Sequence, residues 1–186
     1  SDLIPGINTR TPRTSIIGTD EFDFFLEKNK LYSVIHGSYN YDEICGMFLN
    51  GELSYHLEKK LKSLLAVLNK PLAIRSSSLL EDSTNQPFSG IFETFLIPNN
   101  SADFKLRYKH LSDAIKLVYA SIFSDESRSY FEAINYKLEE EKMAVIIQEV
   151  VGNEFDGYFY PHISGTAQSH NYYPVAHMEP GDGFAI

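Results

Sequence analysis

The sequence is short of several features that mark particular classes of protein. It contains no tryptophan and one cysteine, Cys45. Because there is a single cysteine, neither an intrachain disulfide nor a cysteine-rich zinc site can form. No apolar run approaches the roughly 20 residues that a membrane-spanning helix needs, and no signal-peptide pattern is visible. We therefore expect a protein of the reducing cytoplasm with no membrane partner.

Basic side chains are also in the minority. The 16 Lys and Arg residues stand against 25 Asp and Glu residues, which gives a net charge of −9. A surface of this sign disfavours nucleic acid as a partner. A local basic pocket remains compatible with it.

Several common catalytic and phosphate-binding motifs are missing as well. None of the eleven glycines is followed by lysine, so the phosphate-binding loop GxxxxGK[ST] is absent. Gly181-Asp182-Gly183 begins a GxGxxG pattern, but Ile186 occupies its sixth position. The six histidines form no HExxH pair, and no GxSxG nucleophile motif occurs. These absences exclude P-loop, Rossmann, zincin and α/β-hydrolase chemistry by motif.

What is present is the composition of a globular domain. Of the 186 residues, 43% are hydrophobic and 22% are charged, which is typical of one packed domain. Residues 54–70 and the segment that follows Asp103 repeat apolar residues at intervals of three and four, so both predict amphipathic helices. Asp103 and Asp125 are the expected N-caps of two helices.

Short apolar runs between these helices predict strands. The Ser76–Ser78 run is expected to end the first of them soon after Arg75. The order of helices, strands, two helices and then several strands predicts an α+β (mixed α/β) domain. We divide it into a helical lead-in, residues 1–70, and a sheet-containing part, residues 71–186. The predicted strands are 71–75, 93–97, 143–151, 155–160 and 165–173.

The most informative segment begins with Arg75 at the end of the first predicted strand. We expect its guanidinium to be buried there, where it needs an anion, and its planar fork fits a phosphate or a carboxylate. The serines that follow could join backbone N–H groups around phosphate oxygens. The alternative is a structural turn, in which Arg75 pairs with Glu81 or Asp82 and the serines cap a helix. The residues alone favour that alternative.

A second feature lies at the end of the strand predicted over residues 143–151. Alternation places Gln148 on one face and Glu149 on the other. Polar side chains at the end of an apolar strand need partners, and an adenine edge read by an amide and by backbone groups would supply them. The alternative, again favoured by the residues alone, is a strand that surfaces at its end.

Taken together, the motifs carry a resemblance to a known family. Arg75-Ser76-Ser77, Glu81-Asp82, Phe88-Ser89-Gly90 and Glu93-Thr94 occur in the order found in the N-terminal nucleotide-binding domain of the pyruvate phosphate dikinase and phosphoenolpyruvate synthase family. The order continues through similar blocks, and the resemblance covers nearly the whole chain. The further blocks are residues 119–124, 143–148 and 164–167, with residues 11–17 and 22–26 as the lead-in.

The resemblance implies an ATP-grasp-like fold, with a mixed sheet flanked by helices, as part of a larger unit of two subdomains. ATP would lie between the subdomains, and Mg²⁺ would bridge its phosphates. A phosphoryl group would pass to a histidine on another domain and then to pyruvate, which yields phosphoenolpyruvate.

By position, the resemblance gives roles to particular residues. Arg75 would contact phosphates and stabilise charge that develops during transfer, and Thr94 would assist phosphate or ribose contacts. Gln148 would hold adenine together with the backbone of residues 149–151. Ser76 and Glu93 are lesser contacts, and Glu149 and Val150 supply the backbone groups.

The chain also departs from the family pattern, for example at Asn85-Gln86-Pro87 and at Ile91. The family's Gly-Gly-Lys segment would precede Ser1 and its acidic metal ligands would follow Ile186, so we assign no metal ligand within the chain. We expect an excised part of an ATP-dependent phosphotransferase that is inactive by itself. The alternative is a non-catalytic nucleotide-sensing or interaction module of a larger protein.

Overall fold

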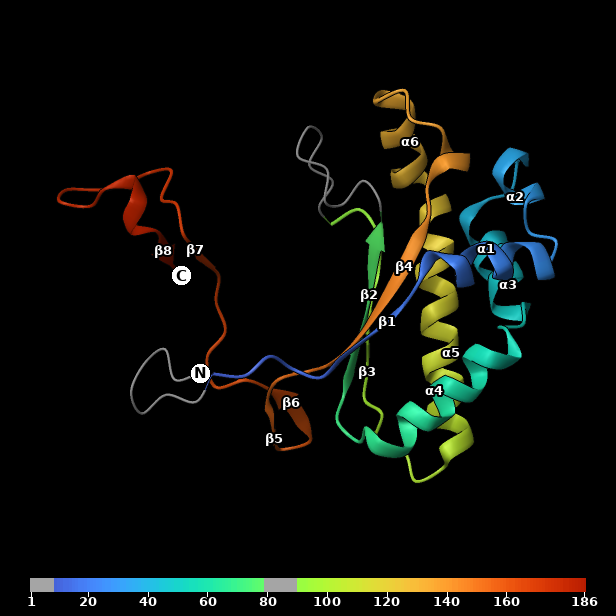
Figure 1. The fold of residues 1–186 in the computed structure, drawn as a ribbon, viewed down its shortest axis with the longest axis horizontal. Coiled ribbons are helices and arrows are strands. Elements are labelled where there is room, and N and C mark those ends of the chain that lie inside the picture. Colours follow the sequence, from blue (N-terminus) through green and yellow to red (C-terminus); the bar gives the residue numbers. More distant parts are fainter. Residues whose placement is uncertain (1–8, 79–89) are drawn as a thin grey trace. The chain divides into compact units, whose positions relative to one another are not determined.

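The computed structural model of the protein describes residues 9–78 and 90–186 (Figure 1). The chain divides into two compact units, Ser1–Val150 and Val151–Ile186. The first unit holds a four-stranded sheet, and the second holds two short two-stranded sheets. The boundary between the units lies at residue 150, and the lead-in over residues 1–70 contributes a strand of its own to the large sheet.

The sheet of the first unit has the strand order β1-β4-β2-β3. All three pairings between these strands are antiparallel. The α+β class and the helices flanking a sheet are therefore confirmed, while the mixed sheet that the resemblance implied is antiparallel in these four strands. The strands are β1 (Thr14–Ile17), β2 (Leu72–Ser78), β3 (Thr94–Ile97) and β4 (Met143–Glu149).

Helices cover one face of this sheet, as Figure 1 shows for α1, α4 and α5. Helix α5 packs along β2 and β3, and α1 packs against β4. None of the helices within the described ranges combines the length and apolarity that crossing a bilayer requires. The helices are α1 (Thr19–Lys28), α2 (Ser33–His36), α3 (Tyr41–Asn50), α4 (Tyr55–Val67), α5 (Phe104–Ala120) and α6 (Asp125–Ala133), with 3-10 turns at Ser121–Phe123 and Leu138–Glu140.

The core between helices and sheet is aromatic in its centre. Tyr119 of α5 packs against Phe22 and Phe25 of α1, and Phe48 of α3 packs on Phe25, with ring centroids 5.1 to 5.6 Å apart. The predicted apolar stripes of α4 and α5 face this core. Their buried members include Leu57, Leu61, Leu65, Leu111, Ile115 and Val118.

Helix starts agree with the sequence at one position and differ at another. The Asp103 side chain accepts a hydrogen bond from the Lys105 N–H, as expected of an N-cap. The cap of α6 is Ser124, one residue before the predicted Asp125, and its hydroxyl accepts from the Ser127 N–H. Asp125 occupies the first turn instead, where its charge favours the positive end of the helix dipole.

Strand β2 runs further than the sequence indicated. The expectation that it would end soon after Arg75 is wrong, because Ser76, Ser77 and Ser78 continue it in register with β4. Ser76 and Ser78 are buried on the same face as Leu72 and Ile74. Pairing with the apolar central strand therefore overrides the weak strand preference of serine.

The second unit contains short hairpins where longer strands were expected. Residues 155–160 form part of a hairpin, whose turn at Asp156-Gly157 has positive φ at both residues, as a two-residue hairpin turn requires. The strand expected over residues 165–173 is reduced to two residues. The unit comprises β5 (Asn153–Phe155), β6 (Tyr158–Tyr160), β7 (Ala167–Gln168), a 3-10 turn (Pro180–Asp182) and β8 (Phe184–Ala185).

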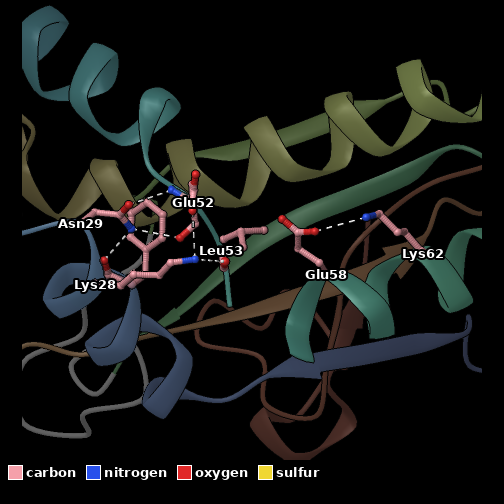
Figure 2. A network of polar contacts seen from close by, with 7 residues as sticks. Lys28, Asn29, Glu52, Leu53, Glu58 and Lys62 are labelled. Atoms are coloured by element: carbon pink, nitrogen blue, oxygen red, sulfur yellow. Dashed lines mark hydrogen bonds and ion pairs between the residues drawn. The ribbon is translucent and has the colours of Figure 1, made fainter. Parts of the chain in front are cut away.

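A polar network in the first unit ties the end of α1 to the connection between α3 and α4 (Figure 2). The Asn29 side chain donates to the carbonyls of Phe25, at 2.8 Å, and Glu52, at 3.0 Å, and accepts from the Glu52 N–H at 2.8 Å. Lys28 pairs with the Glu52 carboxylate at 3.2 Å and donates to the Leu53 carbonyl. This network fixes the helical layer that supports the sheet.

Candidate nucleotide site on the open face of the sheet

The strand register aligns four side chains in one row across the sheet. Arg75 lies opposite Thr94 on one side and opposite Ile146 on the other, and Ile146 lies opposite Ile16. Side chains of directly opposed residues project from the same face of an antiparallel sheet. Arg75 and Thr94 therefore share the face that the helices leave uncovered, which we call the open face.

A second row lies beside the first on the open face. It consists of Thr14, Gln148, Ala73 and Leu96, again in direct register. Gln148 is thus a diagonal neighbour of Arg75, at roughly 7–8 Å between such positions. Of the predicted site residues, the structure brings Arg75, Thr94 and Gln148 onto one surface.

Ser76 and Glu149 lie on the opposite face, because side chains alternate along a strand. Ser76 is buried opposite Val145, and Glu149 lies opposite Leu72. The backbone amide of Glu149 donates to Arg13 O at 3.0 Å. The amide of Val150 donates to the carbonyl of residue 71 at 2.8 Å. These two predicted backbone donors are therefore engaged within the protein, and Ser76 does not present its hydroxyl beside Arg75.

Glu93 precedes β3 and lies near helix α3 rather than in either row. Its carboxylate is a neighbour of the Tyr41 phenol and the Cys45 thiol. Burial, followed by the negative charge that Cys45 and Glu93 can carry, raises the pKa of Tyr41 well above its usual range. Tyr41 stays protonated as a result, and Glu93 is directed toward α3.

Arg75 itself is exposed, which corrects the expectation that its guanidinium is buried. The buried face of β2 carries Leu72 and Ile74 instead, one residue out of phase. None of the ion pairs within residues 9–78 and 90–186 involves Arg75. The alternative partners Glu81 and Asp82 lie outside the described residues.

The open face combines this cation with exposed apolar side chains. Ile16 is 70% exposed and Leu96 is 71% exposed, at the two edges of the sheet. Ile146 between them is half-buried. A surface of this kind, with one guanidinium, two hydroxyls and one amide among aliphatic side chains, suits a ligand with an apolar plane and an anionic end.

Two cavities formed by described residues of the first unit are centred away from Arg75, Thr94 and Gln148, although Ile16 lines the first of them. One of about 390 Å³ follows the edge of β1 beside α1 and α4, and His56, Lys60 and Asp20 are among the residues that line it. Another of about 450 Å³ lies among α3, α4 and α5, where burial lowers the pKa of Lys116 and its ammonium donates to the Leu49 carbonyl. None of the seven predicted site residues lines either cavity.

Metal-ligating side chains do not gather on this surface. Within the described part of the chain, no three His, Cys, Asp or Glu side chains come together as a metal site would need. The side chains of the open face therefore do not fit a Mg²⁺ ion held by protein ligands alone.

Thr14 is a member of the open face that the sequence did not single out. Its hydroxyl accepts a hydrogen bond from Gln148 Nε2 at 3.0 Å. The two residues are far apart in the sequence, and only the β1–β4 register brings them together. A local signal could have found it. Ile17 is buried, and because side chains alternate along a strand, Ile16 and Thr14 are expected on the opposite, outer face.

Comparison with known proteins places the chain in a class of nucleotide-binding domains. Residues 2–184 match the family described as pyruvate phosphate dikinase, AMP/ATP-binding domain. Because the match covers nearly the whole sequence, the chain belongs to this family, and the resemblance inferred from its motifs is confirmed.

Two curated relatives agree with this assignment. The chain is 28% identical over 149 residues to an uncharacterized phosphotransferase, YvkC, of Bacillus subtilis. The aligned segment covers 78% of this chain and 16% of that protein. It is 28% identical over 99 residues to a phosphoenolpyruvate synthase of Aeropyrum pernix. That alignment covers 53% of this chain and 11% of that protein. The chain thus spans only a small part of the length of either relative.

Proposed function

We propose that this chain is the ATP-binding part of a phosphotransferase of the phosphoenolpyruvate synthase and pyruvate phosphate dikinase type. The whole protein would move a phosphoryl group from ATP to a histidine on another domain and then to pyruvate, in the cytoplasm. The observation that carries the proposal is the open face, where Arg75, Thr94 and Gln148 converge from three strands of a domain in this family.

Each of the three side chains has a distinct part in the proposal. The Arg75 guanidinium contacts the phosphates and offsets negative charge in transfer. The Thr94 hydroxyl, directly beside it, donates to a phosphate or ribose oxygen. The Gln148 amide reads the base one row away, which separates base and phosphate by a few ångströms along the strands.

The remaining predicted residues have smaller parts. Because the amides of Glu149 and Val150 are used within the protein, their contribution to adenine binding would come from carbonyl oxygens. Ser76 and Glu93 do not face the open surface and would act through the fold around Arg75 and Thr94. Mg²⁺ would arrive with the ATP phosphates and take its protein ligands from outside the described residues.

The proposal is tested by isothermal titration of Mg-ATP into the natural polypeptide that contains residues 1–186, followed by detection of acid-labile phosphohistidine. We expect saturable ATP binding and a phosphohistidine that forms only with ATP. Residues 1–186 alone are expected to form none, because they lack the accepting histidine domain. Absence of ATP binding by the natural polypeptide would overturn the proposal.

A non-catalytic nucleotide-sensing or interaction module is the second candidate. Exposed Ile16 and Leu96 on either side of Arg75 favour it, because aliphatic side chains around an arginine are also typical of a protein interface. This candidate predicts ATP binding without phosphohistidine, or binding of a protein partner without ATP. The same two measurements therefore separate it from the enzyme.

A further inference from the structure

The hydroxyl of Thr14 takes part in two hydrogen bonds at the edge of the open face. It donates to the Pro12 carbonyl at 3.1 Å. It also lies 3.0 Å from Nε2 of Gln148. Thr14 thus links the backbone that leads into β1 to the one amide side chain of the second row.

The two bonds together fix how the Gln148 amide is oriented. A threonine hydroxyl has a single proton, and here the proton is committed to Pro12. Thr14 can then only accept from Gln148, so the amide must turn its NH₂ group toward Thr14. The reversed amide would place two acceptor oxygens against each other.

This orientation directs the Gln148 carbonyl oxygen, Oε1, away from Thr14. No hydrogen bond within the described residues satisfies Oε1. Its neighbour in the row on β2 is Ala73, whose methyl group neither donates nor accepts a hydrogen bond. Gln148 therefore presents a hydrogen-bond acceptor to whatever lies on the open face.

We propose that Thr14 is a positioning residue that makes the site selective for a 6-aminopurine over a 6-oxopurine. Gln148 Oε1 accepts from the exocyclic amino group of adenine, whereas the carbonyl of hypoxanthine at the same place would face another acceptor. The inference rests on the proposed nucleotide site and adds what decides its choice of base. Without the Thr14 hydroxyl, the amide is free to turn over and donate to a 6-oxo group.

The test compares ATP with inosine triphosphate, which carries oxygen in place of the 6-amino group. Both are titrated with Mg²⁺ into the natural polypeptide containing residues 1–186 and into its Thr14→Val and Thr14→Ser variants. Valine keeps the shape of threonine and suits a strand. We expect Thr14→Val to lower the preference for ATP over inosine triphosphate about three- to tenfold, which is the value of one hydrogen bond. Thr14→Ser keeps the hydroxyl and should keep the preference.

A double-mutant comparison separates positioning from a general effect on the fold. In a Gln148→Leu background, Thr14→Val should no longer change the preference, because there is no amide left to orient. A merely structural role of Thr14 would weaken both nucleotides equally and lower the melting temperature. Thermal melts of all variants provide that check.

The outcomes distinguish this inference from the function on which it rests. If the unaltered protein binds neither nucleotide, both fall. If it binds ATP and inosine triphosphate equally well, or if Thr14→Val retains the full preference for ATP, the role of Thr14 is overturned while the nucleotide site stands. A preference that is lost in Thr14→Val and kept in Thr14→Ser supports the inference.

Discussion

Arg75 on β2 stands directly opposite Thr94 on β3, so that a guanidinium and a hydroxyl lie side by side on the uncovered face of the sheet. The two belong to separate motifs of the sequence, and the pairing of the strands makes them one surface. Exposed Ile16 and Leu96 at the edges of that surface give it an apolar margin. Arg75 and Gln148 lie on the two central strands, β2 and β4, whereas Thr94 and Thr14 lie on the edge strands.

Replacing Arg75 tests the centre of this surface. We expect Arg75→Ala to weaken Mg-ATP binding by roughly ten- to hundredfold, because a hydrogen bond to a charged group contributes about 1.5–3 kcal/mol. Arg75→Lys keeps the charge but loses the planar fork, so it should recover only part of the affinity. Titration calorimetry on the natural polypeptide measures both.

The matched control is Lys105→Ala, which removes one positive charge from an exposed position at the start of α5. It should leave ATP affinity unchanged. Because Arg75 is exposed, neither Arg75 variant should unfold the protein. An equal loss of affinity in Lys105→Ala would mean that net charge alone, and not the open face, attracts the nucleotide.

Asn29 should be important for stability although it is not part of the candidate site. It lies at the end of α1, in the helical layer. Asn29→Ala removes three hydrogen bonds, two that join the end of α1 to the backbone of Glu52 and one to the Phe25 carbonyl (Figure 2). We expect a loss of about 1–3 kcal/mol in the free energy of unfolding. Urea denaturation measures it.

Asn50 offers the comparison for Asn29, since it is an exposed asparagine at the end of α3. Asn50→Ala should change stability by no more than about 0.5 kcal/mol. Equal effects of the two substitutions would show that the Asn29 network contributes nothing measurable.

Asn99 is a second structural asparagine, at the turn between β3 and α5. It is buried, has φ of 52°, and donates to the carbonyls of Leu68 and Lys70 while accepting from Arg107 Nε. Asn99→Ala removes these bonds. It also places alanine, which tolerates a positive φ less well than asparagine, in the left-handed region. We expect a loss of about 2–4 kcal/mol by urea denaturation. A loss no greater than that of Asn50→Ala would contradict this role.

The buried phenol of Tyr119 should make the stability of the protein depend on pH in the alkaline range. Its ring is fully buried among Phe22 and Phe25, and its hydroxyl has no hydrogen-bond partner among the described residues. Burial first, and then Glu21 and Asp20, raises the pKa of Tyr119 far above normal. The unfolded chain releases this proton near pH 10 while the folded protein retains it. Stability should therefore be full below about pH 10 and fall above it.

The Tyr119→Phe variant checks both parts of that argument. Removing an unsatisfied buried hydroxyl should leave stability at pH 7 unchanged or raise it by about 1 kcal/mol. The decline above pH 10 should become shallower but not vanish, because burial also raises the pKa of Tyr108, to about 12. Urea titrations at pH 7 and at two alkaline values measure the slopes. A destabilised variant at pH 7 would show that the hydroxyl has a partner.

The sequence by itself determined the helices and the family. Periodic leucines of residues 57–65 and the apolar repeat after Asp103 fixed the faces of α4 and α5, because a helical period is a local property of the chain. The Asp156-Gly157 turn was equally local, and reading it would have divided residues 155–160 into the observed hairpin. The motif around Arg75 led to the family without any knowledge of contacts.

Only the tertiary structure decided which face each strand presents and which residues meet. A strand alternates with period two, so a shift of one residue moves every side chain to the other face. The Arg75 guanidinium was therefore expected to be buried and lies exposed on the open face. Ser76 was expected to join Arg75 around a phosphate and lies buried on the opposite face. Likewise, Gln148 meets Thr14 across 134 positions of sequence, because β4 is paired with β1 by long-range packing of the core and not by any signal near either residue.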